Sequence, residues 1–193
     1  MEYSLDRLKG KTVEILPYVR GYYPRDILYN LWRSMEDDDL ASAVFPQSKN
    51  EDQAPFKLQG DLIEFVNYFS DPKRILLIVR DHIKGVIAGL HWYDDVILNF
   101  RGWANMFYKK EYWGESAYEA GQLCLDYGFN YLNYKIIYGH TPWAKAAGYA
   151  EKAGMTLLYK MPMGYLLSDG TITDMNILYI KKEDFNGKLT KPI

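Results

Sequence analysis

Three apolar, strand-like runs follow one another between residues 74 and 108, with no helix-length segment between them. RILLIVRD (74–81) is rich in branched aliphatic residues, VIAGLHWY (86–93) follows a tight connection, and residues 96–108 alternate between two faces, which are patterns typical of strands. Short connections join antiparallel neighbours, whereas a parallel crossover needs a longer link. This stretch therefore predicts an antiparallel meander, with a turn at Asp94–Asp95 between its second and third strands.

Segments with other periodicities flank the meander. Apolar residues at helical spacing predict two amphipathic helices before it, one opening near Pro24 and one ending at Asp71–Pro72. The other predicted elements are a first strand over 12–19, a helix from Gly114 to about Leu132, a strand over 134–140, a small helix from Pro142 to Gly154, and a closing hairpin that turns at 167–171. This order predicts an α/β (α+β) fold with a mixed, mostly antiparallel central sheet and helices on both faces.

Composition narrows the classes of protein that such a fold can serve. The 193 residues suit a single domain over 1–193, and a hydrophobic content of 48% can fill a sizeable core. A net charge of -2 gives no basic excess for binding nucleic acid. The single Cys124 excludes an internal disulfide and a cysteine-based zinc site, and the three histidines are too scattered to indicate a metal. A charged N-terminus and the lack of a long apolar run predict a soluble, cytoplasmic protein without a membrane partner.

The stretch EYWGESAYEA (111–120) joins a predicted strand to a predicted helix and places Gly114 at the junction. Backbone N–H groups at a helix N-terminus bind anions well, because they lack intrahelical partners and lie at the positive end of the helix dipole. Gly114 would let a ligand approach the main chain, and Ser116 could add a hydroxyl. The alternative interpretation is purely structural, with a glycine turn and Ser116 as the helix cap.

The element order resembles the Gcn5-related N-acetyltransferase (GNAT) superfamily over nearly the whole chain, in particular the branch that acetylates ribosomal-protein N-termini. YWGES (112–116) stands where that branch has an aromatic–basic–Gly–x–Gly loop, Glu119-Ala120 follows in the helix, and EKAGM (151–155) resembles its Glu-Lys-x-Gly-Phe ending. The resemblance implies acetyl-CoA as co-substrate, with its diphosphate at the Gly114 loop. The implied coenzyme-binding residues are Met106, Phe107, Tyr108, Trp113, Gly114, Glu115, Ser116, Ala117, Trp143 and Lys145.

Several positions depart from the family pattern. Glu111 stands where Gln or Arg is usual, Trp143 and Ala146 stand where a later motif has Asn and Ser, and the tyrosine that serves many members as the acid is one position off, at Tyr149. His140 ends the fifth predicted strand, where the resemblance implies that the fourth and fifth strands splay. Its unperturbed pKa of about 6.5 suits proton transfer. His140 and Tyr149 are therefore the candidate catalytic residues.

The sequence is compatible with three functions. The first is transfer of an acetyl group from acetyl-CoA to a primary amine, which could be a protein N-terminus, a lysine or a small amine. The second is a non-catalytic protein that keeps the fold for assembly, for example within a larger, even viral, particle, with Trp113 and Trp143 filling the coenzyme cleft. The third keeps acyl-CoA binding but uses another acyl group or acceptor. The high aromatic content, 16%, is also compatible with a homo-oligomer or another partner surface.

Overall fold

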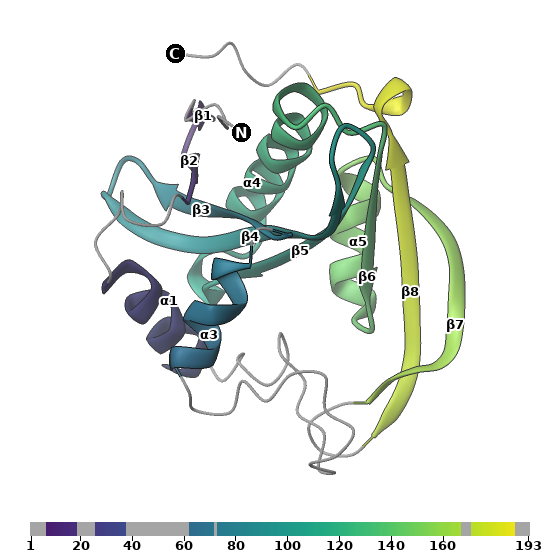
Figure 1. Ribbon diagram of the computed structural model, residues 1–193, viewed down its shortest axis with the longest axis horizontal. Helices are drawn as coiled ribbons and strands as arrows, with labels where there is room; N and C mark the ends of the chain where they lie inside the picture. The colour runs from purple at the N-terminus through teal and green to yellow at the C-terminus, as the bar shows by residue number, and fades with distance from the viewer. Residues whose placement is uncertain (1–6, 19–25, 38–61, 72, 167–170, 188–193) are drawn as a thin grey trace.

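The computed structural model describes residues 7–18, 26–37, 62–71, 73–166 and 171–187, and within them eight strands form one sheet in the order β1-β2-β3-β4-β5-β6-β8-β7 (Figure 1). The strands are β1 (Leu8–Lys9), β2 (Val13–Pro17), β3 (Ile75–Asp81), β4 (Val86–Ile97), β5 (Arg101–Tyr108), β6 (Ile136–Thr141), β7 (Thr156–Leu166) and β8 (Ile172–Lys181). The α-helices are α1 (Asp26–Asp37), α3 (Leu62–Ser70), α4 (Glu115–Asp126) and α5 (Ala144–Lys152). None of the helices described is long and apolar enough to cross a membrane.

The sheet is mixed and mostly antiparallel, as the order of elements predicted. Among the described strands, only β5 and β6 run parallel, and every other neighbouring pair is antiparallel. The predicted meander is β3–β4–β5. The crossover through α4 returns the chain to the same end of the sheet, so that β6 can lie parallel to β5.

The predicted turn at Asp94–Asp95 is wrong. β4 continues through both aspartates to Ile97, and the chain turns after it, where Asn99 has a φ of 58°. Asp95 has a φ of 44°, and the pairing of β4 with β5 shifts register between Asp94 and Ile97. Asp and Asn adopt positive φ more readily than most residues. The two aspartates therefore form an irregularity within a strand and not its end.

Helices cover both faces of the sheet, and each face has its own core (Figure 1). On one face, α1 and α3 pack Leu31, Trp32 and Phe65 against Trp92 and Phe107 of the sheet. The other core holds α4 and α5 residues together with sheet residues, including Ala120, Cys124, Ala150, Tyr93 and Ile137. Cys124 is buried in this core, and burial raises the pKa of its thiol, so it packs as a small core residue and is poorly suited to act as a nucleophile.

The predicted C-terminal ends of α5 and α4 can be compared with the structure. Gly154 has a φ of 101°, its N–H donates to the Glu151 carbonyl at 2.9 Å, and the Met155 N–H donates to the Ala150 carbonyl at 3.0 Å. This is the glycine-closed helix end that the sequence predicted for α5. The α-helical part of α4 ends at Asp126, and a π-helical turn over Tyr127–Tyr131 carries the helical segment to the predicted end near Leu132. Strand β1 was not predicted, and Pro24, Pro72 and residues 167–170 lie outside the described residues.

Candidate active site

The parallel ladder between β5 and β6 is short. It runs from Arg101, paired with Ile136, to Ala104, paired with Gly139. Further along, within the described residues, β5 pairs only with β4, and β6 pairs only with β8. Two adjacent strands therefore part beyond Ala104 and Gly139, and residues 105–108 have no strand partner on that side.

Helix α4 begins at Glu115, shortly after β5 ends at Tyr108. Gly114 precedes the helix with a φ of 105° and a ψ of −128°, a conformation that side chains disfavour. A Cβ added to Gly114 would meet no atom within 4 Å, so the space in front of the main chain is open. The Tyr118 N–H donates to the Gly114 carbonyl at 3.0 Å, and the N–H groups of residues 115–117 precede this first intrahelical bond. This arrangement suits an anion.

Trp113 connects three elements beside this N-terminus. Its indole N–H donates to the Tyr108 carbonyl at the end of β5, at 2.9 Å, and the Lys145 ammonium of α5 lies 5.1 Å from its ring centroid. Trp113 is 45% exposed and Trp143 is 43% exposed. Both indoles are therefore partly exposed to solvent.

The other sequence-predicted coenzyme residues lie on both faces of β5 and on the first turn of α4. Alternation along β5 places Met106 and Tyr108 towards α4, whereas Phe107 is buried in the core with α1 and α3. Only the backbone of Phe107 can line a ligand on the α4 side. Glu115 forms an exposed ion pair of 3.4 Å with Lys152, and Ser116 and Ala117 are half-buried beside it.

His140 lies on the face of the sheet opposite α4. Trp103 of β5 stacks on Tyr138 of β6 with a centroid distance of 5.1 Å, and it meets the His140 ring edge-on at 5.5 Å. Although His140 is exposed at its outer side, burial of the remainder lowers its pKa below the ordinary value, and Asp94 opposes this shift. The imidazole is therefore mostly neutral at neutral pH and can accept a proton. Tyr149 is half-buried on α5, and no described contact joins it to His140.

No protein-family model matches the chain, and no curated protein sequence matches it. Solved structures do match. A spermidine N-acetyltransferase from Vibrio cholerae, in complex with CoA and spermine, has a TM-score of 0.71 and 18% identity over 90% of this chain and 97% of that chain. A GNAT-family acetyltransferase from Bacillus anthracis has a TM-score of 0.68 and 17% identity over 92% of this chain and 99% of that chain. This chain has the GNAT fold.

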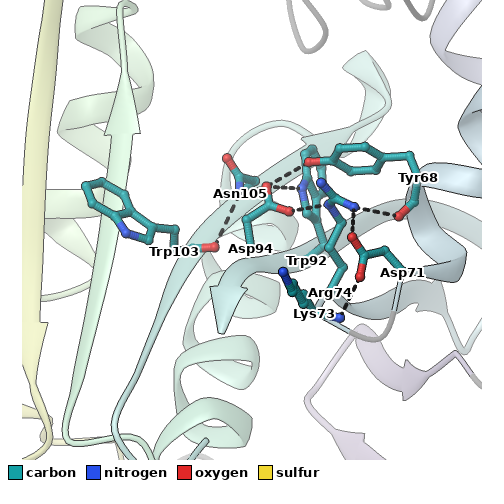
Figure 2. A network of polar contacts seen from close by, with 8 residues as sticks. All are labelled: Tyr68, Asp71, Lys73, Arg74, Trp92, Asp94, Trp103 and Asn105. Carbon is teal, nitrogen blue, oxygen red and sulfur yellow. Dashed lines mark hydrogen bonds and ion pairs between the residues drawn. The ribbon is translucent and has the colours of Figure 1, made fainter. Parts of the chain in front are cut away.

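The GNAT fold of this chain contains a polar network that the sequence did not predict (Figure 2). One carboxylate oxygen of Asp94 accepts hydrogen bonds from the Tyr68 hydroxyl at 2.8 Å and from Trp92 Nε1 and Asn105 Nδ2, both at 3.0 Å. The other oxygen accepts from Arg74 Nε at 2.8 Å. Asp94 therefore ties α3, β3, β4 and β5 together on the face that carries His140. The only local signal was the Asp-Asp pair, which is typical of turns.

Replacing Asp94 with Asn is expected to lower the free energy of unfolding by about 2 kcal/mol, because an amide presents one acceptor oxygen to four donors. Urea denaturation followed by circular dichroism measures the change. The matched control is Asp95→Asn, which keeps a residue that tolerates the φ of 44° and removes only an exposed ion pair with Arg101. The control should cost less than about 1 kcal/mol. Equal losses in the two variants would contradict the role of the network.

Glu119 of α4 makes long-range hydrogen bonds that the local sequence does not reveal. Its carboxylate accepts hydrogen bonds from the Thr12 hydroxyl at 2.6 Å, from the Thr12 and Val13 N–H groups at 3.0 and 3.4 Å, and from the Lys11 N–H. Partial burial alone would raise the pKa of Glu119, but these donors outweigh it and lower the pKa. Glu119 therefore anchors the β1–β2 turn to α4.

Replacing Glu119 with Gln is expected to lower the free energy of unfolding by about 1 kcal/mol at pH 7, because the carboxylate bonds are partly exposed. A depressed folded-state pKa stabilises the fold above the ordinary value of 4.5 and stops doing so as pH falls through the folded-state pKa. The stability difference between wild type and Glu119→Gln should therefore shrink as the pH is lowered below that ordinary value. Urea titrations at several pH values test this, and a difference that is constant with pH would contradict it.

Proposed function

We propose that this chain, acting as one domain over residues 1–193, is an acetyl-CoA-dependent N-acetyltransferase whose acceptor is a primary amine. The observation that carries the proposal is the parting of β5 and β6 beyond Ala104 and Gly139, directly beside the open N-terminus of α4. A gap in the sheet lets a thioester held on one face meet an amine that approaches from the other face. The GNAT fold of the two solved acetyltransferases supports the same reading.

The coenzyme would be held mainly by backbone groups. The diphosphate fits the N–H groups of residues 115–117, where Gly114 leaves room and the helix dipole favours negative charge. Residues 105–108 have no strand partner on the β6 side, and their main-chain groups, apart from the Tyr108 carbonyl that Trp113 occupies, would be offered to the amide groups of the pantetheine arm. Lys145 could move from the Trp113 ring to a phosphate, because both lie at this end of the cleft.

The candidate catalytic groups have complementary tasks. Neutral His140 takes a proton from the acceptor ammonium, directly or through water, and the freed amine nitrogen attacks the thioester carbonyl carbon. Backbone N–H groups at the end of the β5–β6 ladder stabilise the oxyanion. As the carbon–sulfur bond breaks, Tyr149 donates its proton to the departing thiolate. The acylated nitrogen then loses its second proton, which restores the Tyr149 hydroxyl directly or through water. The products are an N-acetylated amine and free coenzyme A.

The amine class is supported by the Vibrio cholerae neighbour, which is a spermidine N-acetyltransferase solved with CoA and spermine. The sequence resemblance points instead to protein N-termini, as in the ribosomal-protein branch. Both acceptors present a primary amine, so the reaction is the same and only the recognition differs.

Isothermal titration with acetyl-CoA is the first test, followed by a thiol-release assay with a panel of amines. Saturable binding and amine-dependent release of coenzyme A are expected. Absence of binding at millimolar acetyl-CoA would contradict the proposed function.

A second candidate is a non-catalytic protein with the GNAT fold. The bond from the Trp113 indole to the Tyr108 carbonyl favours it, because this indole occupies backbone at the end of β5 that a pantetheine arm would otherwise use. Titration of Trp113→Ala separates the two candidates. If the wild type does not bind acetyl-CoA but Trp113→Ala does, the indole blocks the cleft and the non-catalytic candidate is correct.

A further inference from the structure

An open pocket of about 560 Å³ lies at the start of β6. Phe100, Ile136 and Tyr138 form its apolar wall, and Lys135, Lys181, Lys182 and Glu183 also line it. It is at the opposite end of β6 from His140, so it is not part of the coenzyme cleft.

Tyr138 links the pocket to the candidate acceptor site. This side chain lines the pocket and also stacks on Trp103, which contacts His140. Alternate residues of a strand share a face, so Ile136, Tyr138 and His140 point to the same side of β6. Lys181 is the register partner of Ile136 and lies on that side too. At a rise of about 3.3 Å per residue, Tyr138 at the near edge of the pocket is about 7 Å from His140, and the Ile136–Lys181 pair is about 13 Å from it.

The charge of the pocket is positive. Among its lining residues, Glu183 is the acidic one, and it pairs with Lys181 at 3.5 Å. The Lys182 ammonium donates to the carbonyl of Phe129 at 2.6 Å, and Phe129 belongs to the core that holds α4, so Lys182 is not counted as a ligand contact of the pocket. Lys135 is exposed and has no carboxylate partner among the described residues. An apolar wall with excess ammonium groups suits a carboxylate-bearing chain and repels a polycation.

We propose that the acceptor is a peptide α-amine, and that the peptide runs along β6 from His140 with an acidic side chain at about its fourth or fifth residue in this pocket. This inference rests on the proposed function and specifies which class of primary amine is the acceptor. A polyamine would bring further ammonium groups towards Lys135 and Lys181 and is therefore a poor acceptor.

The test uses hexapeptides with Glu, Gln or trimethylated Lys at position 4, together with spermidine. Trimethylation keeps the positive charge of this Lys peptide, so that in every peptide the α-amine is the only acceptor amine. The full chain is assayed for acetylation by release of coenzyme A, and fluorescence anisotropy measures peptide binding in the presence of coenzyme A. The Glu peptide is expected to exceed the Lys peptide about ten-fold in kcat/KM, with the Gln peptide between them. Moving the Glu to position 2 should remove most of this preference.

The double variant Lys135→Glu/Lys181→Glu should reverse the preference, so that the Lys peptide becomes the better substrate. Both lysines are exposed, so the fold should persist, and the melting temperature checks this. Lys9→Glu is the matched control, because Lys9 is exposed on β1, the edge strand farthest from β7 in the sheet order. It should leave the preference unchanged.

Two outcomes overturn the inference, and they are distinguishable. If acetyl-CoA binds and amines are acetylated, but Glu and Lys peptides react equally or spermidine reacts best, the pocket assignment is wrong and the proposed function stands. If acetyl-CoA does not bind at all, both fall.

Discussion

Gly114→Asp is expected to abolish binding of acetyl-CoA, with a loss of at least about a hundred-fold in affinity. The substitution places a carboxylate where the main-chain N–H groups of α4 would hold a diphosphate. It also forces a side chain onto a residue with a φ of 105°. That backbone strain is expected to lower the free energy of unfolding by about 1–3 kcal/mol. Isothermal titration measures the binding, and thermal denaturation measures the stability.

Two controls separate charge from strain and position. Gly114→Ala carries the same backbone strain without the charge, so it should retain a measurable part of the affinity. Gly121→Asp adds the same charge nearly two turns further along α4, where a Cβ also meets no atom within 4 Å, and it should bind acetyl-CoA like the wild type. If Gly114→Asp binds as well as Gly114→Ala, the diphosphate does not lie at the N-terminus of α4.

His140→Ala is expected to lower kcat/KM by about a hundred-fold or more, because it removes the proposed base. The dependence of the rate on pH tests the same role. A base must be neutral to act, so the wild-type rate should rise with pH through the pKa of His140, which lies below its ordinary value of 6.5. This limb of the profile should be lost in the variant, while acetyl-CoA binding is retained.

His82→Ala is the matched control, because His82 lies in the β3–β4 turn and bonds the Gly10 carbonyl at 3.3 Å, far along the sheet from β6. It should keep the wild-type rate and profile. His91 is not a competing base, since burial lowers its pKa to about 3 and leaves it neutral in the core. A His140→Ala enzyme with unchanged pH dependence would show that another group, or water alone, removes the proton.

The coenzyme part of the candidate site was accessible to sequence reasoning because its signal is local. A glycine between a predicted strand and a predicted helix indicates both an accessible main chain and a helix N-terminus. In the structure, Gly114 is the residue that precedes α4. The acceptor part was not accessible. Trp103, Tyr138 and His140 come from two strands separated by a helix, and only the parallel register of β5 and β6 brings their rings together.

By itself, the sequence determined the order of the elements and the mixed sheet, because hydrophobic periodicity reports the faces that each helix or strand must bury. It also determined the closure of α5 at Gly154, which depends on one residue's freedom to adopt positive φ. Only the tertiary structure decided where the chain turns after β4, which donors Asp94 and Glu119 accept from, and that a pocket forms at the start of β6 on the strand that carries His140. These features depend on contacts between residues far apart in the chain, and no local pattern encodes which distant partner a carboxylate or a ring will meet.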